Sequence, residues 1–333
     1  MNGLDIPDDS THAVFLDLVK NIVPYMADKS VSEIMVNRPN DVWIKQNGSL
    51  VKVDCDLDGI SIRSAMQALA RIEQKEIQEN TEAAILDCHI GPFRIACVMS
   101  PTAVDGHAMC IRKHSSSNMT LDDYRENGFF NPPETNDSVS NGSLELWDIL
   151  RNAVKNKKNI LVAGGTDTGK TTMLNALIAE IPGSDRVISI EDTIELNVRV
   201  QNKVRLLSNA QAGIHMRDLL RLSLRMRPDR IVVGEVRGEE AYDLLQVFNS
   251  GHDGGFATIH ASNGKKALMR LESLVMQSEA AKMGYEAIKL MVASTINYVV
   301  FLKSSGGKRY LSELLEITDF DDGKYVMNNL VRR

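Results

Sequence analysis

The sequence contains few cysteines, and their spacing argues against the usual cysteine-built sites. Its 333 residues include Cys55, Cys88, Cys97 and Cys110, which lie far apart and form no C-x-x-C pair. Neither a zinc site nor a disulfide framework is therefore indicated. We expect buried free thiols instead, because an unmodified cysteine behaves as a small hydrophobic side chain.

Long apolar runs and an excess of positive charge are also missing. No run approaches the roughly 20 apolar residues that a membrane-spanning helix needs, and the acidic first residues lack the basic-then-apolar layout of a signal peptide. The net charge of −6 and the pI near 5.7 argue against bulk binding of nucleic acid. These features predict a cytoplasmic protein, and 43% hydrophobic residues over 333 positions suffice for two domain cores.

One glycine-rich segment carries a specific signal. Residues 164–171 match the phosphate-binding pattern G-x-x-x-x-G-K-[ST]. The apolar run 159–163 before it predicts a buried parallel strand, and residues 172–179 after it predict a helix. In this context loop N–H groups and the helix N-terminus cradle phosphate oxygens, and Lys170 adds a positive charge. The residues predicted to bind a nucleoside triphosphate are Gly164, Gly165, Thr166, Asp167, Thr168, Gly169, Lys170, Thr171 and Thr172, with the Thr171 hydroxyl on Mg²⁺.

Asp167 is unusual in this loop, because many such loops carry glycine at its position. Aspartate tolerates left-handed backbone angles better than most non-glycine residues, so the turn can form. Its side chain could cap the loop or the helix start rather than face the ligand.

Acidic residues follow a second strand candidate, the segment 186–190. Glu191 and Asp192 come directly after it, and Glu195 stands three residues further on. At the carboxyl edge of a parallel sheet such groups can hold waters around Mg²⁺. Read alone, this segment would more often be a solvated acidic turn.

The segment 230–235 reads as an apolar strand that ends in a single acid. Gly234 stands where an ordinary Walker B strand has its aspartate, which leaves Glu235 to orient or activate the attacking water. The alternative is a surface glutamate paired with Arg237. A fourth strand, 256–259, follows a glycine cluster and ends at His260, which is placed to contact a γ-phosphate, although a lone histidine is usually structural.

By composition the chain divides into two structured parts. Residues 1–113 mix helix and strand patterns and predict an α+β domain. Residues 114–143 are polar and turn-rich, which is typical of a linker. In residues 144–333 strands alternate with helices around the glycine loop, which predicts a mostly parallel α/β sheet.

The first part also shows individual elements. We expect a hairpin turning at Asn47-Gly48, a helix over 61–78 and strands near 93–99 and 107–112. An apolar stripe at helical spacing over 14–23 favours a face packed in the domain, with membrane contact as the rarer alternative.

The four motifs, in this order, resemble those of the secretion and traffic ATPase superfamily, which serves type II and type IV secretion, conjugation and type IV pili. The resemblance is strong over about residues 145–303. It includes an Asp box at 190–195, an atypical Walker B strand at 228–237 and a His box at 251–261. It extends to residues 31–37, which look like the family's opening strand.

This resemblance implies a fold and a set of roles. The fold would be a RecA-like P-loop domain preceded by a smaller α+β domain, in a homo-hexamer that hydrolyses ATP with Mg²⁺ between its two domains. Glu235 would be the catalytic carboxylate, Glu191 would shape the metal's outer shell together with Asp192 and Glu195, and His260 would contact the γ-phosphate. Arg94 and Arg112 match arginines of the N-terminal domain that reach the triphosphate in relatives.

The branch of the superfamily follows from what is absent and from the tail. The tetracysteine insert of type II secretion and pilus-extension ATPases is missing, as is the signature of retraction motors, and residues 294–301 look like the conjugation and type IV secretion branch. The resemblance then implies inner-membrane components of such a machine as partners, with peripheral association at the cytoplasmic face. We expect no stable nucleic-acid binding.

Other readings stay open from the sequence. The chain could drive a pilus or type II secretion system, or be a RecA-like nucleic-acid motor, against which its acidic pI weighs. It could also be a nucleotide-gated scaffold without turnover, which the intact Lys170 and Glu235 disfavour.

Overall fold

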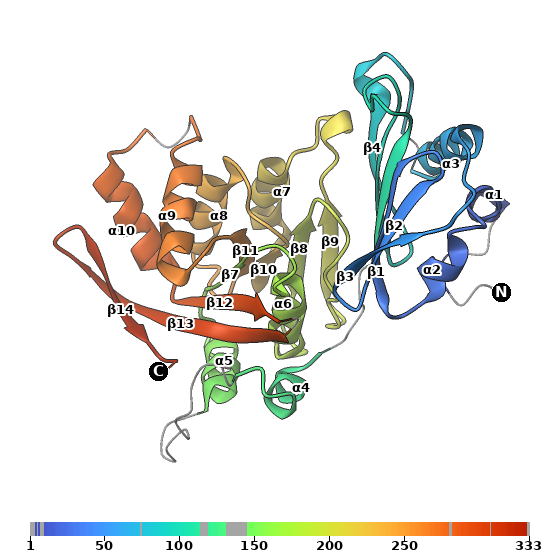
Figure 1. Ribbon diagram of the computed structural model, residues 1–333. Coiled ribbons are helices and arrows are strands. Elements are labelled where there is room, and N and C mark those ends of the chain that lie inside the picture. Colours follow the sequence, from blue (N-terminus) through green and yellow to red (C-terminus); the bar gives the residue numbers. More distant parts are fainter. Residues whose placement is uncertain are drawn as a thin grey trace. The chain divides into compact units, whose positions relative to one another are not determined.

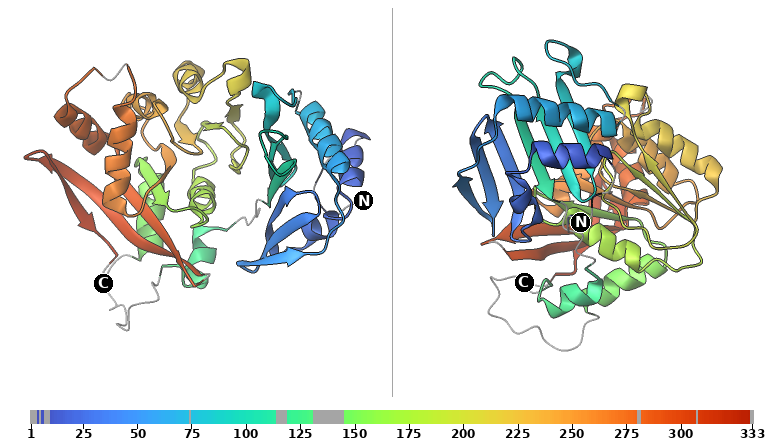
Figure 2. Two further views of the ribbon diagram at one scale, coloured as in Figure 1. Left: turned by 45° about the horizontal axis from the view of Figure 1, so that its top comes forward. Right: turned by 90° about the vertical axis from the view of Figure 1, so that its right-hand side faces the viewer.

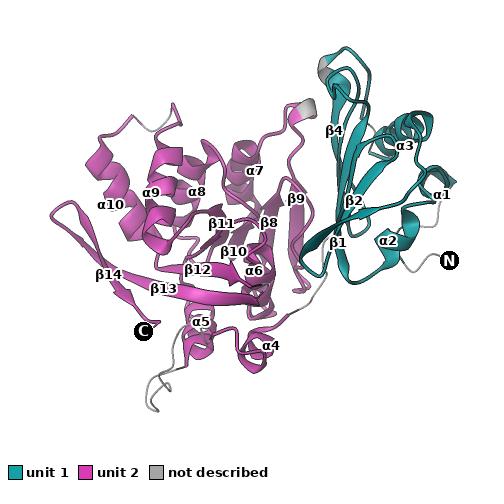
Figure 3. Cartoon of the chain, in the orientation of Figure 1, with its two compact units in different colours: residues 1–116 teal, residues 117–333 magenta. Residues whose placement is uncertain are grey.

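The computed structural model describes residues 10–73, 75–113, 119–130, 145–279, 282–306 and 308–331, together with Leu4 and Ile6 (Figure 1). The chain forms two compact units, residues 1–116 and residues 117–333, which are coloured separately in Figure 3. In the described part of the chain, no helix combines the length and the apolar character that crossing a bilayer requires.

Unit 1 is built on a six-stranded antiparallel sheet with the strand order β3-β2-β1-β6-β5-β4. The predicted hairpin is confirmed, since β2 and β3 pair across Asn47 (φ 50°) and Gly48 (φ 84°), the two positive φ angles of a type I′ turn. The strands are β1 (Val31–Arg38), β2 (Asp41–Gln46), β3 (Ser49–Val53), β4 (Ile85–Ile90), β5 (Phe93–Val98) and β6 (Ala108–Lys113).

Helices cover one face of this sheet. Figure 2 shows α1 (Ser10–Leu18) and α3 (Gly59–Ile72) crossing the same face, with α2 (Val23–Ala27) and the 3₁₀ turn η1 (Glu82–Ala84) at its borders. The predicted apolar stripe runs through α1, the turn after it and the start of α2. Phe15, Val19 and Ile22 have no exposed surface and pack into the core of unit 1, whereas Val14 is 54% exposed.

The third helix illustrates why these residues fold as they do. Asp58 caps it by accepting a hydrogen bond from the Ser61 N–H at 2.7 Å. Its buried positions form an apolar face, and they are Ile62, Ala65, Met66, Ala68, Leu69 and Ala70. The sequence predicts this helix as far as residue 78, but it ends at Ile72. The reason is that the apolar stripe stops there, since Glu73 and Glu76 would occupy its next turn.

Unit 2 is built on an eight-stranded sheet with the order β14-β13-β12-β7-β11-β10-β8-β9. The six strands from β12 to β9 in that order run parallel, and the hairpin partners β13 and β14 run antiparallel. The strands are β7 (Ile160–Gly164), β8 (Val187–Glu191), β9 (Lys203–Leu207), β10 (Arg230–Val233), β11 (Phe256–His260), β12 (Tyr298–Ser305), β13 (Lys308–Asp321) and β14 (Lys324–Asn329).

Helices pack on both faces of this sheet, which explains why its central strands β7, β8 and β11 are buried and largely apolar. In β7, Leu161 and Ala163 face one core and Ile160 and Val162 face the other. The first core includes α7 (Met216–Ser223), α8 (Glu240–Phe248), α9 (Gly264–Val275) and α10 (Tyr285–Thr295). The second includes α4 (Leu121–Glu126), α5 (Leu146–Lys155) and α6 (Lys170–Ala179). The predicted α/β fold, with a smaller α+β part before a mostly parallel sheet, is confirmed.

Part of the segment predicted as a linker belongs to unit 2. Residues 114–118 and 131–144 lie outside the described residues, but 119–130 form α4 and the turn after it. Thr120 and Asp123 cap this helix reciprocally. Phe129 and Phe130 are each 5% exposed and pack in the core. The linker prediction missed Phe129 and Phe130 because it rested on the overall polar composition of residues 114–143.

The expectation of buried thiols is correct for three cysteines and wrong for Cys110. Cys110 lies on β6 between the buried Met109 and Ile111. Successive side chains of a strand point to opposite faces, so Cys110 points to the face opposite those two core residues.

The placement of Phe129 in the core generates a stability prediction. We expect Phe129→Ala to lower the free energy of unfolding of unit 2 by about 3–5 kcal/mol, because it leaves a cavity in a packed core. The chain has two tryptophans. In a Trp43→Phe background, Trp147, whose ring lies 5.6 Å from that of Phe130, reports denaturant unfolding of unit 2. Leu290→Ala, at a residue 53% exposed, is the control. Equal effects of the two changes would contradict the core assignment.

Candidate functional site

The carboxyl ends of four neighbouring strands of unit 2 bring the predicted motifs to one edge of the sheet. His260, the last residue of β11, is paired in register with Gly164 at the end of β7. Val233 on β10 is paired with Ile190 on β8, one residue before Gly234 and Glu191. Because parallel strands end at the same edge, residues that are far apart in sequence share one site.

The glycine-rich loop leaves β7 and enters α6 in the predicted way. Gly169 (φ 90°) is the N-cap of the helix, and Lys170 is its first residue. A Cβ at Gly164 would lie 2.4 Å from the Thr168 hydroxyl oxygen, so no larger residue fits the turn. Asp167 has a φ of 61° and so takes the left-handed conformation expected of it.

The carbonyl of Gly165 is held by side chains of the loop itself. The Thr168 hydroxyl donates to it at 3.0 Å, and the Lys170 ammonium donates to it at 2.9 Å. The lysine side chain therefore folds back over its own loop. Its positive charge is thereby held at the phosphate-binding loop.

Side chains from all four motifs form one continuous chain of contacts. The Lys170 ammonium lies 3.3 Å from Nε2 of His260, and the same Nε2 lies 2.9 Å from Oε1 of Glu235. The other oxygen of Glu235 pairs with Arg237 at 2.6 Å, and Arg237 pairs with Asp192 at 2.6 Å. The structure thus brings together a lysine, a histidine and two carboxylates that the sequence predicted separately.

Arg237 is the member of this chain whose full role the sequence did not indicate. Its pairing with Glu235 was foreseen as the alternative to a catalytic glutamate, and that ion pair exists. Glu235 nevertheless has a side chain only 14% exposed and also contacts His260, so it is no ordinary surface glutamate. The bridge to Asp192 spans 45 residues of sequence and could not be read from local pattern.

Glu191 is buried and organises the turn after β8. Its Oε1 accepts hydrogen bonds from the N–H groups of Glu195 and Leu196, both at 2.7 Å. Burial raises the pKa of the Glu191 carboxyl, although these two N–H donors act to lower it. Glu195 takes part in this turn through its backbone, since its carbonyl also accepts from the Asn175 amide at 3.1 Å.

Glu191 also explains the glycine at the Walker B position. A Cβ at Gly234 would lie 3.3 Å from Cγ of Glu191, tighter than an ordinary contact. The space that an aspartate on β10 would fill is thus occupied by a glutamate from the neighbouring strand β8. Thr258 secures this end of β10, because its hydroxyl donates to the Gly234 carbonyl at 2.7 Å.

The donors at this edge suit a hard cation. Thr171 and Thr172 lie in the first turn of α6, and Glu191, Asp192 and Glu235 supply carboxylates at the same sheet edge. Among the described residues, no group of three His, Cys, Asp or Glu side chains could hold a metal by itself. Mg²⁺ does not require one, because it usually takes one or two protein ligands together with waters and substrate phosphates.

The two predicted arginines lie in unit 1 and oppose each other directly. Arg94 on β5 is in register with Arg112 on β6, so both point to the same face of the sheet. Arg94 makes two hydrogen bonds to Asp87, at 3.2 and 2.6 Å. Arg112 lies 3.6 Å from Glu33. Their predicted contact with the triphosphate remains a prediction from the family resemblance.

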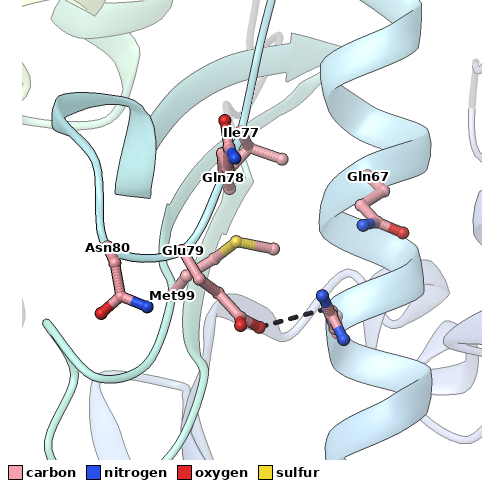
Figure 4. Close-up of a pocket in the computed structure, with 7 residues that line it drawn as sticks. Gln67, Ile77, Gln78, Glu79, Asn80 and Met99 are labelled. Atoms are coloured by element: carbon pink, nitrogen blue, oxygen red, sulfur yellow. Dashed lines mark ion pairs between the residues drawn. The ribbon is translucent and has the colours of Figure 1, made fainter.

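A separate cavity of about 240 Å³ lies in unit 1, beside α3, and Figure 4 shows its lining. Its charged groups already contact one another, since Arg63 pairs with Glu79 at 3.1 Å and His107 lies 3.8 Å from the same carboxylate. None of the predicted site residues lines it. We assign it no part in the site.

The family model described as "Type II/IV secretion system protein" matches residues 18–303. The chain is 33% identical over 341 residues to the type IV secretion system protein VirB11 of Bartonella quintana, covering 92% of this chain and 94% of that one. It is 30% identical over 301 residues to the conjugal transfer protein TrbB of Rhizobium radiobacter, covering 90% and 87%.

A solved structure supports the fold. The ATPase DotB of Yersinia pseudotuberculosis matches with a TM-score of 0.59 over 92% of this chain and 80% of that chain. At 18% identity this likeness shows the fold alone.

The buried Glu191 generates a prediction about pH. Its folded pKa lies above the ordinary 4.5, so the folded protein binds this proton more tightly than the unfolded chain does. Its contribution to stability is therefore greatest below pH 4.5 and falls as the pH rises to the folded pKa. Glu191→Gln keeps the accepting oxygen but cannot ionise. We expect the unfolding free energy of the variant minus that of the wild type to increase over this window, by about 1.4 kcal/mol per unit of pKa elevation.

Denaturant titrations at a series of pH values measure this difference. Glu126→Gln, at a carboxylate whose side chain is 71% exposed, is the control for the amide substitution itself. A difference between Glu191→Gln and the wild type that does not change with pH would contradict the raised pKa of Glu191.

Proposed function

The chain belongs to the type II/IV secretion system protein family, and we propose that it is the P-loop ATPase of a type IV secretion or conjugation system. The reaction is hydrolysis of ATP to ADP and phosphate. Its energy would drive substrate transport or pilus assembly. The relatives named for type IV secretion and conjugation, at 30–33% identity, favour this branch over pilus or type II secretion motors.

The observation that carries this proposal is the contact chain from Lys170 to Asp192. It joins the phosphate-binding loop, the His box, the Walker B strand and the Asp box at one sheet edge. If these contacts served only to stabilise the fold, they would not need to include the lysine of the phosphate-binding loop. A phosphoryl-transfer site needs a phosphate-binding cation, a carboxylate near the attacking water and a group that contacts the γ-phosphate.

Lys170 would exchange partners when ATP binds. In the structure its ammonium is held by the Gly165 carbonyl and lies near His260. A phosphate oxygen carries charge and is a stronger partner than a neutral carbonyl. The lysine would therefore turn to the β- and γ-phosphates, and His260 would be released to contact the γ-phosphate.

Glu235 would orient the attacking water and accept its proton. Arg237 and His260 each contact one of its two oxygens, and these contacts fix the direction of the carboxylate. The absence of a Cβ at Gly234 leaves room for the Glu191 side chain of the neighbouring strand, so two carboxylates lie at one sheet edge. Groups held in position before the substrate binds would need little reorganisation during the reaction.

The same edge would hold the metal. The Thr171 hydroxyl would be a direct ligand of Mg²⁺, and Glu191, Asp192 and Glu235 would hold its waters. When bound, Mg²⁺ supplies positive charge that offsets the charge on the transferring phosphoryl group.

Assembly and location are the finer part of the proposal. We infer a homo-hexamer in which unit 1 contributes Arg94 and Arg112 to the triphosphate, docked on inner-membrane components at the cytoplasmic face of the membrane. Family membership supports the ring and the docking. The net charge of −6 supports the absence of stable nucleic-acid binding. Domain closure on ATP and opening after hydrolysis would transmit the force.

The role of Glu235 can be tested by removing only its basicity. We expect Glu235→Gln to retain ATP binding and to lower turnover by roughly two orders of magnitude or more, the usual effect of losing a general base. Lys170→Ala should lose nucleotide binding itself. Steady-state phosphate release and nucleotide titration distinguish these outcomes.

Glu239→Gln is the matched control, because Glu239 lies nearby in sequence but pairs with Arg217 on α7. Its turnover should stay within about twofold of wild type. Wild-type turnover in Glu235→Gln would remove that carboxylate from the mechanism, and wild-type binding in Lys170→Ala would remove the loop.

The two arginines of unit 1 give an independent test. An arginine that enters a phosphoryl-transfer site can contribute about 10³ or more in rate. We expect Arg94→Ala and Arg112→Ala to reduce turnover far more than ADP affinity, because the γ-phosphate is the partner that is lost. Arg38→Ala, at a side chain of unit 1 that is 55% exposed, should change neither. Near-normal turnover in a well-folded Arg94→Ala, Arg112→Ala double variant would exclude unit 1 from the active site.

A further inference from the structure

Arg309 reaches the phosphate-binding loop from β13, two strands away from β7 in the same sheet. It lies on β13, whose hairpin partner β12 is paired with β7, so that Leu302 is in register with Gly164. The Nε of Arg309 donates a hydrogen bond to the Asp167 carbonyl at 2.9 Å. Its Cδ lies 3.4 Å from where a Cβ of Gly169 would stand. Sequence reasoning missed this residue, because 142 positions separate it from the loop.

The direction of that carbonyl matters because of peptide geometry. The Asp167 carbonyl and the Thr168 N–H belong to one planar trans peptide, so they point in opposite directions. A phosphate-binding loop works by pointing its N–H groups inward at the anion. Its carbonyls must then point outward, and each of them needs a partner.

The structure supplies such partners at two positions of the loop. The Gly165 carbonyl accepts from Thr168 and Lys170, both within the loop motif. The Asp167 carbonyl accepts from Arg309, which is a tertiary contact. Only Arg309 couples the loop to the β12–β13 hairpin among these three donors.

Asp167 is also the position where the loop most needs support. Its φ of 61° lies in the left-handed region, which non-glycine residues adopt rarely and hold only where the surroundings enforce it. Glycine would adopt this angle without help. The guanidinium also places a positive charge beside a residue that brings a negative one to the loop.

We propose that Arg309 is a positioning residue of the nucleotide site. By holding the Asp167 carbonyl outward, it keeps the Thr168 N–H directed at the phosphate chain of the bound nucleotide. Without it, the peptide plane between Asp167 and Thr168 can rotate, and one donor to the phosphates is lost. This inference rests on the proposed function, because it requires a nucleotide phosphate in the loop.

Two variants separate the hydrogen bond from the charge. In Arg309→Gln the amide nitrogen occupies the same place along the side chain as Nε of arginine, so a donor is kept and the charge is lost. Arg309→Met keeps an unbranched side chain of similar reach and loses both. Lys308→Met is the matched control, since Lys308 is the adjacent positive charge on β13 and points to the opposite face of the strand.

The experiment measures ADP affinity by titration, KM and kcat for ATP, and the melting temperature of the nucleotide-free protein. We expect Arg309→Met to weaken ADP binding and to raise KM by about tenfold, the usual effect of losing one hydrogen bond that involves a charged group. The value of kcat should change much less, because the contact supports ground state and transition state alike. Arg309→Gln should stay within about threefold of wild type, and Lys308→Met within about twofold.

Three results would overturn the inference. Equal weakening in Arg309→Gln and Arg309→Met would mean that charge acts rather than the hydrogen bond. Wild-type affinity in Arg309→Met would mean that the contact between Arg309 and the Asp167 carbonyl does not contribute to ADP binding. A melting temperature lowered in Arg309→Met and equally in Arg309→Gln, with affinity following it, would indicate a structural role only.

Failure of the proposed function would look different. In that case the wild-type protein and Lys170→Ala would bind ADP equally weakly, and no Arg309 variant would have an affinity to lose. If the wild type binds ADP and Lys170→Ala does not, the loop is functional, and the Arg309 variants test the inference alone.

Discussion

Glu235 lies between two nitrogen-bearing side chains, and the geometry of the site depends on this carboxylate. One oxygen is 2.9 Å from His260 and the other is 2.6 Å from Arg237. Through His260 it is connected to Lys170, and through Arg237 to Asp192. The Glu235 side chain is only 14% exposed, whereas those of Arg237 and His260 are 52% and 49% exposed, so solvent reaches these ion pairs from the side of the nitrogen-bearing partners.

The surrounding sheet makes such an arrangement necessary. Its central strands are buried on both faces, so their middles are apolar. Charged side chains stand at the strand ends, as Arg230 does at the start of β10, where it pairs with Asp185, and as Glu191 does at the end of β8. Gly234 and Glu191 show the consequence. The acid that an ordinary β10 would carry is supplied by β8, and the missing Cβ at residue 234 leaves room for it. The glutamate is held by two N–H groups, which offset part of the cost of its burial.

The phosphate-binding loop shows the same logic at the level of the backbone. Inward N–H groups require outward carbonyls, and the Asp167 carbonyl is held by Arg309. The Gly165 carbonyl accepts from the Thr168 hydroxyl and, in the structure, from Lys170. The β12–β13 hairpin therefore does more than extend the sheet, since it carries Arg309. Unit 1 presents a comparable pattern on its own sheet, where Asp87 and Glu33 hold the opposed Arg94 and Arg112. Such acidic partners keep the arginines ordered on the sheet surface.

The sequence by itself determined the elements whose signals are local: the strand, loop and helix around Lys170, the Asn47-Gly48 turn, the left-handed Asp167, and the strand ends that carry Glu191, Glu235 and His260. Periodicity and turn chemistry act over a few residues, so they can be read without the fold. Only the tertiary structure decided that Arg237 bridges to Asp192, that Arg309 holds the loop, that Phe129 belongs to a core and that Cys110 does not. Each of these depends on which segments the sheet order and the packing bring together, and long-range pairing leaves no trace in the local pattern of residues.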